Sequence, residues 1–333
     1  MTTTMELCSN ALRGLFVAAP SKKLVVADLK NIEGRVLPWM AGEEWKLQAF
    51  RDYDAGTGFD LYVLAIARAL GLDPAAVTKF QRQIGKVIEL AMGYAGGVGA
   101  FVTMAATVEL DLDALTVAAW GVIPYDVMKI AEWMWEKAVE EGNTFGLRRE
   151  TYIVCDSLKT LWRRAHPAIA AKKVGLWDSV QNEVRSAIQN PAGVYGAGRC
   201  TMRRTGNWLR IRLPSGRTLS YPSPCVDDDG GITYMGVNQY SHRWSRIRTY
   251  GGKLVENIDQ AIARDVLGWA MPRAEAAGYQ LVLTVHDELV TETPDEPRYN
   301  AEALSAILAQ GEEWTEGLPL AAAGFEGKRY RKE

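Results

Sequence analysis

The residues best suited to chemistry are His286, Asp287 and Glu288, which separate two short apolar segments, residues 280–285 and 289–293. Two apolar strands that are joined tightly usually turn through Gly or Asn. Adjacent carboxylates at such a junction are costly unless something binds them. Oxygen ligands favour Mg²⁺, so these residues are a candidate divalent-metal site. The spacing leaves a solvated hairpin tip with a hydrogen-bonded histidine as the alternative.

A further carboxylate, Asp28, ends another apolar segment, residues 24–27, which is predicted to be a buried strand. An Asp after a strand is more often a helix N-cap or a loop residue. If Asp28 lies beside Asp287 in space, however, the pair can hold two Mg²⁺ ions about 3.5–4 Å apart. One ion would then bind the attacking oxygen and the other the leaving oxygen.

A predicted helix over residues 77–94 carries Arg82, Lys86, Leu90 and Tyr94 at steps of four residues. Each step lags a full turn by about 40°, so these side chains form one slowly winding stripe. Two cations and an aromatic ring on one helix face suit a nucleotide, whose triphosphate and base they would contact. A surface Arg/Lys pair beside an ordinary buried Leu and Tyr is the alternative.

The composition excludes several classes of protein. The 333 residues include 38 basic and 40 acidic ones, a net charge of −2, so the chain is not a wholly basic nucleic-acid binder, although a local basic groove is compatible with this balance. The sequence contains no run of about 18 apolar residues, so no membrane span is predicted. The N-terminus has no secretory signal, and no cysteine pair has the CxxC spacing of a zinc site. We therefore expect a cytoplasmic protein without disulfides.

Helices and strands both contribute to positioning these residues, and we expect an α+β fold. The middle of the chain is mainly helical, and the helix pattern over residues 31–50 contains Pro38, where we expect a kink or a break. After residue 190 the pattern changes to strands, with a hairpin over residues 208–221. A long helix over residues 255–277 precedes the two apolar strands. Further helices are predicted over residues 59–70, 110–141 (with a break near 121–124), 157–171 and 177–189.

Three segments resemble motifs A, B and C of the family A DNA polymerases, in the right order. VVADLKNIEGR (residues 25–35) resembles motif A, RQIGKVIELAMGYAGG (82–97) resembles motif B, and TVHDELV (284–290) resembles motif C. QAIARD (260–265) is similar to the palm helix that touches the primer–template minor groove. The resemblance runs from about residue 9 to the end, and the residues of the matching segments are most similar to those of phage-encoded members.

The resemblance implies a role for each matching residue. Asp28 and Asp287 match the carboxylates that hold two Mg²⁺ ions, to which the Leu29 carbonyl adds a ligand, and Glu288 matches an accessory acid. Lys86 matches both a triphosphate ligand and a general acid toward pyrophosphate. The other implied nucleotide contacts are Arg82 (triphosphate), Tyr94 (insertion site), Glu33 (exclusion of a ribose 2′-OH), Leu90 (where Phe or Tyr is usual) and Tyr62 (where a phosphate-contacting His is usual).

The resemblance also implies contacts with primer–template DNA and a discontinuous right-hand fold. His286 matches a residue near the primer end, Gln260 and Asn257 would face the minor groove, and Arg246 and Arg248 would contact the backbone. An antiparallel palm sheet with helices would come from residues 1–42 and 246–333. A mainly α-helical fingers subdomain would come from residues 43–245. We expect neither a thumb nor an exonuclease domain.

The implied activity is template-directed addition of deoxynucleotides (dNTPs) to a primer 3′-OH by two-metal-ion phosphoryl transfer. The alternative is an inactive or partner-dependent DNA-binding fragment of a split polymerase, in which a separate chain supplies the thumb and exonuclease. A single-subunit RNA polymerase shares the palm plan, but Glu33 and Glu288 speak against it. The expected compartment is the cytoplasm, which is the host cytoplasm if the chain is phage-encoded, and no membrane partner is expected.

Overall fold

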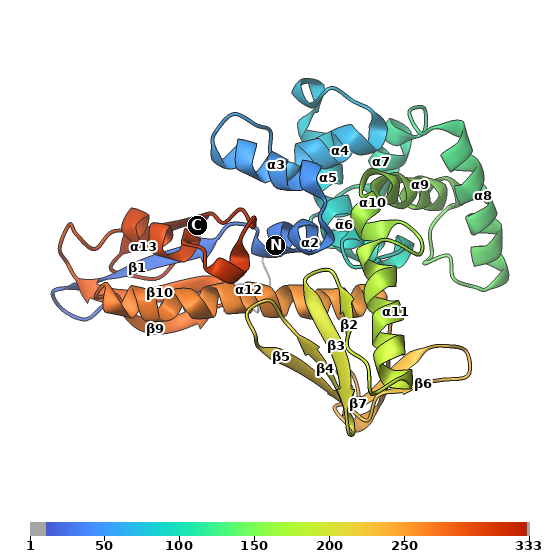
Figure 1. Cartoon of the computed structure of the whole chain (residues 1–333). Helices are drawn as coiled ribbons and strands as arrows, with labels where there is room; N and C mark the ends of the chain where they lie inside the picture. Colours follow the sequence, from blue (N-terminus) through green and yellow to red (C-terminus); the bar gives the residue numbers. More distant parts are fainter. Residues whose placement is uncertain (1–10, 332–333) are drawn as a thin grey trace. The chain divides into compact units, whose positions relative to one another are not determined.

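The computed structural model describes residues 11–331 and forms an α+β fold with antiparallel sheets, which confirms the predicted fold class (Figure 1). The chain divides into two compact units. We call residues 11–36 with 259–331 the sheet unit and residues 37–258 the helical unit. Helices α2 (Ile32–Ala41) and α12 (Gly251–Ala276) each begin in one unit and end in the other. Within residues 11–331 no helix is long and apolar enough to cross a membrane.

The sheet unit is built on four antiparallel strands in the order β11, β1, β10 and β9. Their bounds are Ala322–Gly327 (β11), Lys22–Leu29 (β1), Glu288–Pro294 (β10) and Gln280–Val285 (β9). The strands predicted from the apolar segments therefore pair with one another. Helix α13 (Ala301–Ala309) lies against β1 and β11, and a short 3₁₀ turn, Glu313–Thr315, follows it (Figure 1).

One face of this sheet carries an apolar cluster that leads directly to carboxylates. Because side chains alternate along a strand, Leu24, Val26 and Asp28 share one face of β1. Leu24 and Val26 are buried in a cluster with residues of β10, β11 and the C-terminal segment. In the antiparallel register, Val26 lies opposite Val290 and Asp28 lies opposite Glu288. The apolar face therefore ends in two facing acids.

Helix α2 continues through Pro38, so of the kink or break that the sequence predicts, the break does not occur. The helix continues to Ala41, and Gly42 follows it with φ +71°. The backbone N–H of Glu43 donates to the Pro38 carbonyl at 2.9 Å. A left-handed glycine just beyond the last turn is the usual helix end. Pro38 is the seventh of the ten residues of α2, so the helix contains an interior proline and lacks the one N–H that would donate to the Gly34 carbonyl.

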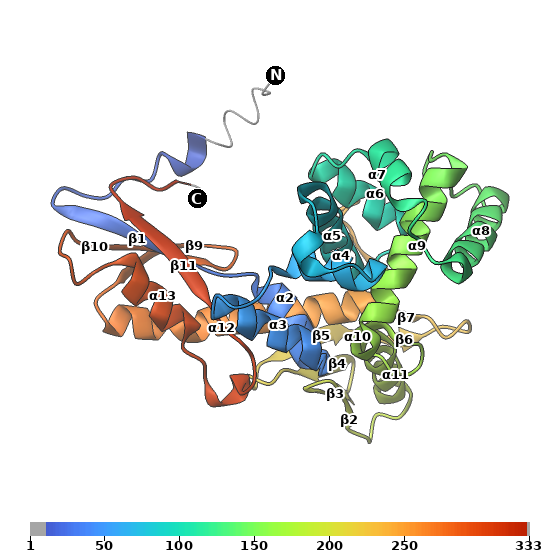
Figure 2. The same ribbon diagram turned by 90° about the horizontal axis from the view of Figure 1, so that it is seen from above.

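The first part of the helical unit is a group of helices around α9, which packs against α4, α5, α6, α7 and α8 (Figures 1 and 2). Every residue from Thr151 to Leu158 of α9 is buried, as expected for a helix surrounded by others. The helices are α3 (Glu44–Asp54), α4 (Leu61–Leu70), α5 (Lys79–Met92), α6 (Val98–Thr107), α7 (Leu112–Ala119), α8 (Tyr125–Glu140), α9 (Arg149–Ala165), α10 (Pro167–Ala170) and α11 (Leu176–Gln189), with a 3₁₀ turn at Pro74–Ala76.

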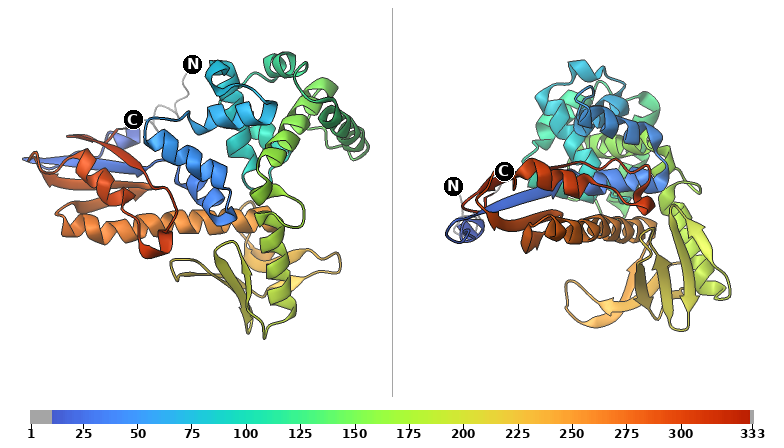
Figure 3. Two further views of the ribbon diagram at one scale, coloured as in Figure 1. Left: turned by 45° about the horizontal axis from the view of Figure 1, so that its top comes forward. Right: turned by 60° about the vertical axis from the view of Figure 1, so that its left-hand side comes forward.

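The second part of the helical unit consists of two small antiparallel sheets that lie along α11 (Figure 3). One sheet has four strands, including the predicted hairpin, and the other has three, including a hairpin that the sequence pattern did not predict. The strands are β2 (Tyr195–Ala197), β3 (Cys200–Thr205), β4 (Trp208–Arg212) and β5 (Thr218–Pro222), followed by β6 (Cys225–Val226), β7 (Ile232–Val237) and β8 (Trp244–Thr249).

Candidate active site

The turn between β9 and β10 presents the His286–Asp287 pair. Val285 pairs with Glu288, so the turn between the two strands consists of His286 and Asp287. His286 adopts φ +54°, a left-handed conformation that tight hairpins usually reserve for Gly, Asn or Asp. Histidine tolerates this region better than most residues but at some energetic cost. The cost is consistent with a turn that is kept for its side chains.

Three carboxylates meet at this turn. Asp28 and Glu288 lie directly opposite each other on β1 and β10, and like charges in that position repel. The N–H of Leu29 donates to the carbonyl of Asp287 at 3.2 Å, which ties the turn to the end of β1. A hollow of about 190 Å³ is lined by Asp28, Asp287 and Glu288. All three acids therefore border the same hollow.

The environments of the three acids differ. Asp28 is exposed, Asp287 is partly buried, and Glu288 is only 9% exposed. Burial raises the pKa of Asp287, against smaller opposing effects of a backbone hydrogen bond and His286. Glu288 accepts a hydrogen bond from the hydroxyl of Tyr330. Burial and this charged acceptor raise the pKa of Tyr330 to about 12. Ionisation of Asp287 is thus opposed by its burial, whereas the Glu288 carboxylate is stabilised by the hydrogen bond from Tyr330.

The oxygen donors fit Mg²⁺. Within residues 11–331, no group of three or more His, Cys, Asp or Glu side chains is already arranged around a common metal position. Mg²⁺ does not need such a cage, since it is commonly held by one or two carboxylates together with waters and substrate phosphates. Asp28 and Asp287 line one hollow and supply such a pair. A cation there would also relieve the repulsion between Asp28 and Glu288 and the cost of charging a partly buried Asp287.

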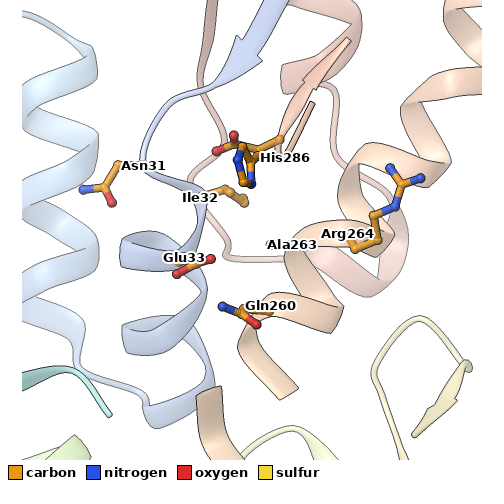
Figure 4. A pocket seen from close by; sticks show the side chains of 8 residues that line it. Asn31, Ile32, Glu33, Gln260, Ala263, Arg264 and His286 are labelled. Carbon is orange, nitrogen blue, oxygen red and sulfur yellow. The ribbon is translucent and has the colours of Figure 1, made fainter. Parts of the chain in front are cut away.

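A second hollow, of about 480 Å³, adjoins the first and shares His286 and Asp287 with it. Glu33, in the first turn of α2, and Gln260, on α12, point toward each other across this hollow (Figure 4). Asn31 also lines it and adopts φ +48°. Two residues with left-handed backbone, Asn31 and His286, thus border the same space, and such residues cluster at functional sites.

The helical unit holds the residues predicted to contact a nucleotide, except Glu33, which lies in the sheet unit. The Arg82 Nε donates to Asp60 at 2.7 Å, and its guanidinium lies 5.3 Å from the centre of the Tyr62 ring. Asp60 also caps α4 by accepting from the N–H of Tyr62 and of Val63. Burial raises the pKa of Tyr62, with a smaller contribution from Glu89. Arg82 is therefore oriented by an acid and a ring, and a phosphate would have to share it with Asp60.

Lys86, Leu90 and Tyr94 follow Arg82 at steps of four along α5 and its end. Lys86 and Tyr94 are partly buried and Leu90 is 42% exposed. Gly85 allows α5 to approach α4 closely, because a Cβ at this position would come within 1.9 Å of the Tyr62 carbonyl oxygen. The close packing sets the position of Arg82 and Lys86 relative to Tyr62.

The remaining predicted DNA contacts also lie in the helical unit. The amide Nδ2 of Asn257, on α12, donates to the Tyr221 hydroxyl at 3.0 Å. Arg246 and Arg248 are exposed on β8. Thus the structure gathers Asp28, Leu29, Glu33, Gln260, His286, Asp287 and Glu288 in the sheet unit, and it places Tyr62, Arg82, Lys86, Leu90, Tyr94, Arg246, Arg248 and Asn257 in the helical unit.

The sequence analysis missed three residues around these hollows. Arg264 lines the larger hollow and follows Gln260 by four residues on α12, a spacing that could have identified it. Arg13 lines the smaller hollow, and its guanidinium lies 5.4 Å from the centre of the Tyr330 ring. Tyr330 is 42 residues from its partner Glu288, and no local pattern connects them.

Comparison with known proteins gives matches to DNA polymerases. No protein-family model matches the chain. The DNA polymerase of Bacillus phage SP02 is 32% identical over 332 residues, covering 98% of this chain and 44% of the phage protein. DNA polymerase I of Chloroflexus aurantiacus is 37% identical over 90 residues, 27% of this chain and 9% of that protein. The thermostable DNA polymerase I of Thermus filiformis is 31% identical over 136 residues, 40% of this chain and 15% of that protein.

Among solved structures, the POL domain of Pol1 from M. smegmatis, in complex with DNA primer-template and dNTP, matches 99% of this chain and 43% of that chain. The sequence identity is 16% and the TM-score is 0.49. The chain spans less than half the length of the curated relatives that it matches. The phage match runs along almost the whole chain and includes all the segments that resemble motifs A, B and C. The chain is thus similar in sequence to a phage DNA polymerase along almost its whole length and to two bacterial DNA polymerases I along part of it.

Proposed function

We propose that this chain catalyses template-directed DNA synthesis, adding deoxynucleotides to the 3′-OH of a primer. The observation that carries the proposal is the pair of carboxylates, Asp28 and Asp287, which line one hollow at the end of an antiparallel sheet. Their pattern resembles that of the metal-binding acids of the family A DNA polymerases. The similarity to a phage DNA polymerase along 98% of the chain supports the same activity.

In the proposed reaction, the primer 3′-oxygen attacks the α-phosphorus of a dNTP and the bond to pyrophosphate breaks. Asp28, Asp287 and the Leu29 carbonyl would hold two Mg²⁺ ions. When bound, these ions neutralise charge on the attacking and leaving oxygens. Glu288, held by Tyr330, keeps a further negative charge beside this pair. The chain's own contribution to catalysis is then mainly positioning and electrostatic stabilisation.

The helical unit would contact the triphosphate and the base of the nucleotide. Arg82 and Lys86 would hold the triphosphate through charge-assisted hydrogen bonds, and Lys86 would donate a proton to the leaving pyrophosphate. Tyr94 would occupy the insertion site before the base enters. Tyr62 would hydrogen-bond a phosphate, and Leu90 would stand where Phe or Tyr is usual. The ion pair of Arg82 with Asp60 supports this role, because it holds the guanidinium on the exposed stripe of α5.

The sheet unit would bind the sugar and the primer. Glu33 lines the larger hollow beside Gln260, where a carboxylate would repel and obstruct a ribose 2′-OH. Gln260 would read the minor groove, together with Asn257 on the same helix. His286 would lie near the primer end, because it borders both hollows. The natural partners are accordingly primer–template DNA and dNTPs.

Primer extension tests the proposal. A labelled primer on a longer template is incubated with Mg²⁺, four dNTPs and the chain at low salt. Extension should fall roughly 1,000-fold in Asp28→Asn and in Asp287→Asn, because several kcal/mol of transition-state stabilisation depend on the metal ions. Glu302→Gln removes an exposed acid of α13 in the same unit and should extend like the parent. Folded parent protein that does not extend the primer, or full activity in both aspartate variants, would overturn the proposal.

A further inference from the structure

The β7–β8 hairpin (residues 232–249) in the helical unit exposes aromatic and cationic side chains together on one side. Val237 lies opposite Trp244, Met235 opposite Arg246 and Thr233 opposite Arg248. Since cross-strand partners and alternate residues share a face, Trp244, Arg246 and Arg248 line one face of a two-stranded ribbon. Trp244 is 62% exposed, and both arginines are exposed.

The opposite face of the hairpin is the one that packs. Tyr234 contacts Tyr221 of the neighbouring sheet edge to face, with ring centres 4.9 Å apart. Ile232 and Thr249, which pair with each other, are buried. The hairpin therefore packs through one face, and the exposure of Trp244, Arg246 and Arg248 on the other face does not result from loose packing. The ribbon is anchored on one face and presents the other.

The tip of the hairpin is held in place by its own hydrogen bonds. The side-chain oxygen of Asn238 accepts from the N–H of Tyr240 and of Ser241, each at 3.0 Å. The N–H of Asn238 donates to the carbonyl of Arg243 at 2.9 Å, and the N–H of His242 donates to the carbonyl of Asn238 at 2.8 Å. Tyr240, 95% exposed, therefore projects from an ordered turn.

The charge on this hairpin has one sign. Residues 232–249 contain three arginines and one histidine but no Asp or Glu. At its base, Arg248 lies 3.6 Å from Asp227. Arg246 donates through Nη1 to the Ser223 carbonyl and to the Thr233 hydroxyl, at 3.2 and 3.1 Å. These contacts orient Arg246 while using only one of its nitrogens, and a guanidinium has five N–H donors.

We propose that the β7–β8 hairpin binds single-stranded nucleic acid, with Trp244 and Tyr240 stacking on unpaired bases and Arg243, Arg246 and Arg248 contacting phosphates. Exposed rings beside arginines are the combination that binds single strands without sequence preference. Bases within a duplex are already stacked, so exposed rings gain most from an unpaired strand. The inference goes beyond the proposed catalysis, because this binding requires neither metal nor nucleotide.

Binding is measured by the fluorescence anisotropy of a labelled 16-nucleotide oligothymidylate, in EDTA so that catalysis plays no part. Trp244→Ala and Tyr240→Ala should each weaken binding about five- to 150-fold, as expected for the loss of one stacked base. Trp133→Ala is the matched control, because Trp133 on α8 is 60% exposed. This control should bind the oligonucleotide like the parent.

Two further variants separate stacking from charge and from misfolding. Tyr240→Phe keeps the ring and should restore most of the affinity that Tyr240→Ala loses. Arg246→Gln should reduce the slope of log affinity against log salt by about 0.7, the contribution of one phosphate contact on a single strand. Each variant should melt at the parental temperature, because the substituted side chains are exposed.

The inference is overturned if the Trp244 and Tyr240 variants bind like the parent, or if the parent does not bind the single strand at low salt. It is also overturned if the variants lose only self-association in sedimentation, which would assign the hairpin to a second copy of the chain. Failure of catalysis is a separate result. A chain that does not extend primers but binds single strands through Trp244 contradicts the proposed function and leaves this inference intact.

Discussion

A buried ion pair between Lys46 and Glu89 should be a principal support of α5, the helix that carries Arg82 and Lys86. Lys46 on α3 is 2% exposed and pairs with Glu89, which is 9% exposed. The indole nitrogen of Trp162 donates to the same carboxylate at 2.8 Å. Burial alone would raise the pKa of Glu89, but Lys46 and His166 outweigh it and hold that pKa well below its ordinary value.

Replacing Lys46 with Met keeps the length of the side chain and removes its charge. Removing one partner of a buried ion pair typically costs about 3–5 kcal/mol. Trp162 still donates to Glu89, so we expect a cost near the lower limit, about 3 kcal/mol. In a unit of about 200 residues, this corresponds to a fall in Tm of roughly 6–12 °C. Thermal unfolding followed by circular dichroism measures this fall.

The exposed pair between Lys129 and Glu132 provides the control. Its atoms lie 3.0 Å apart, but the side chains are 57% and 25% exposed. Exposed pairs contribute about 0–1 kcal/mol, so Lys129→Met should change Tm by only a few degrees. The double variant Lys46→Met/Glu89→Leu should recover stability relative to Lys46→Met, because it removes the charge that was left buried. Equal effects of Lys46→Met and Lys129→Met, or no recovery in the double variant, would refute this explanation.

The same pair predicts a pH dependence. The pKa of Glu89 is lower in the folded chain than its ordinary value of 4.5, so its charge stabilises the fold above that pH. The contribution declines as the pH falls below about 4.5, where the unfolded chain takes up this proton, and it is fully lost only at the lower pKa of the folded chain. The difference in stability between the parent and Lys46→Met should therefore be largest near neutral pH and shrink in acid.

Three further predictions concern packing and chemistry. Gly85→Ala should lower both the Tm and the rate of primer extension, because the new Cβ would meet a carbonyl oxygen of α4. Its control is Gly268→Ala, where the new Cβ lies in open space on a helix. This variant should raise stability by about 0.5–1 kcal/mol in the same melts. Tyr330→Phe should raise the Mg²⁺ concentration needed for half-maximal extension, since Glu288 loses its donor, and an unchanged Mg²⁺ requirement would argue against a positioning role. Glu33→Ala should increase ribonucleotide use relative to dNTP use by about 10- to 100-fold in single-turnover insertion.

The sequence predicts the central strands well because their signals are local. Residues 24–27 lie within β1, residues 280–285 coincide with β9, and residues 289–293 lie within β10. Each segment contains consecutive apolar residues and adjoins Asp28, His286 or Glu288. The acids of the site follow directly, because Asp28 and Glu288 come at the ends of these strands and antiparallel pairing places them opposite each other.

What the sequence did not predict depends on long-range packing. Strand β11 has small residues and little alternation, and it fits beside β1 only because Gly324 lets the two backbones approach, where a Cβ would come within 1.9 Å of the Val26 carbonyl oxygen. The Tyr330–Glu288 hydrogen bond and the Lys46–Glu89 pair each join residues more than 40 positions apart. No local periodicity encodes such partners, so only the folded chain identifies them.

Single-nucleotide insertion tests the central claim most directly. Four primer–templates that differ only in the first unpaired template base are each incubated with one dNTP at a time, Mg²⁺ and the chain. We predict that each template directs insertion of its complementary dNTP alone, and that Asp287→Asn abolishes all four insertions. Insertion that ignores the template base, or template-directed insertion that persists in Asp287→Asn, would contradict the assignment of a DNA polymerase active site built on Asp28 and Asp287.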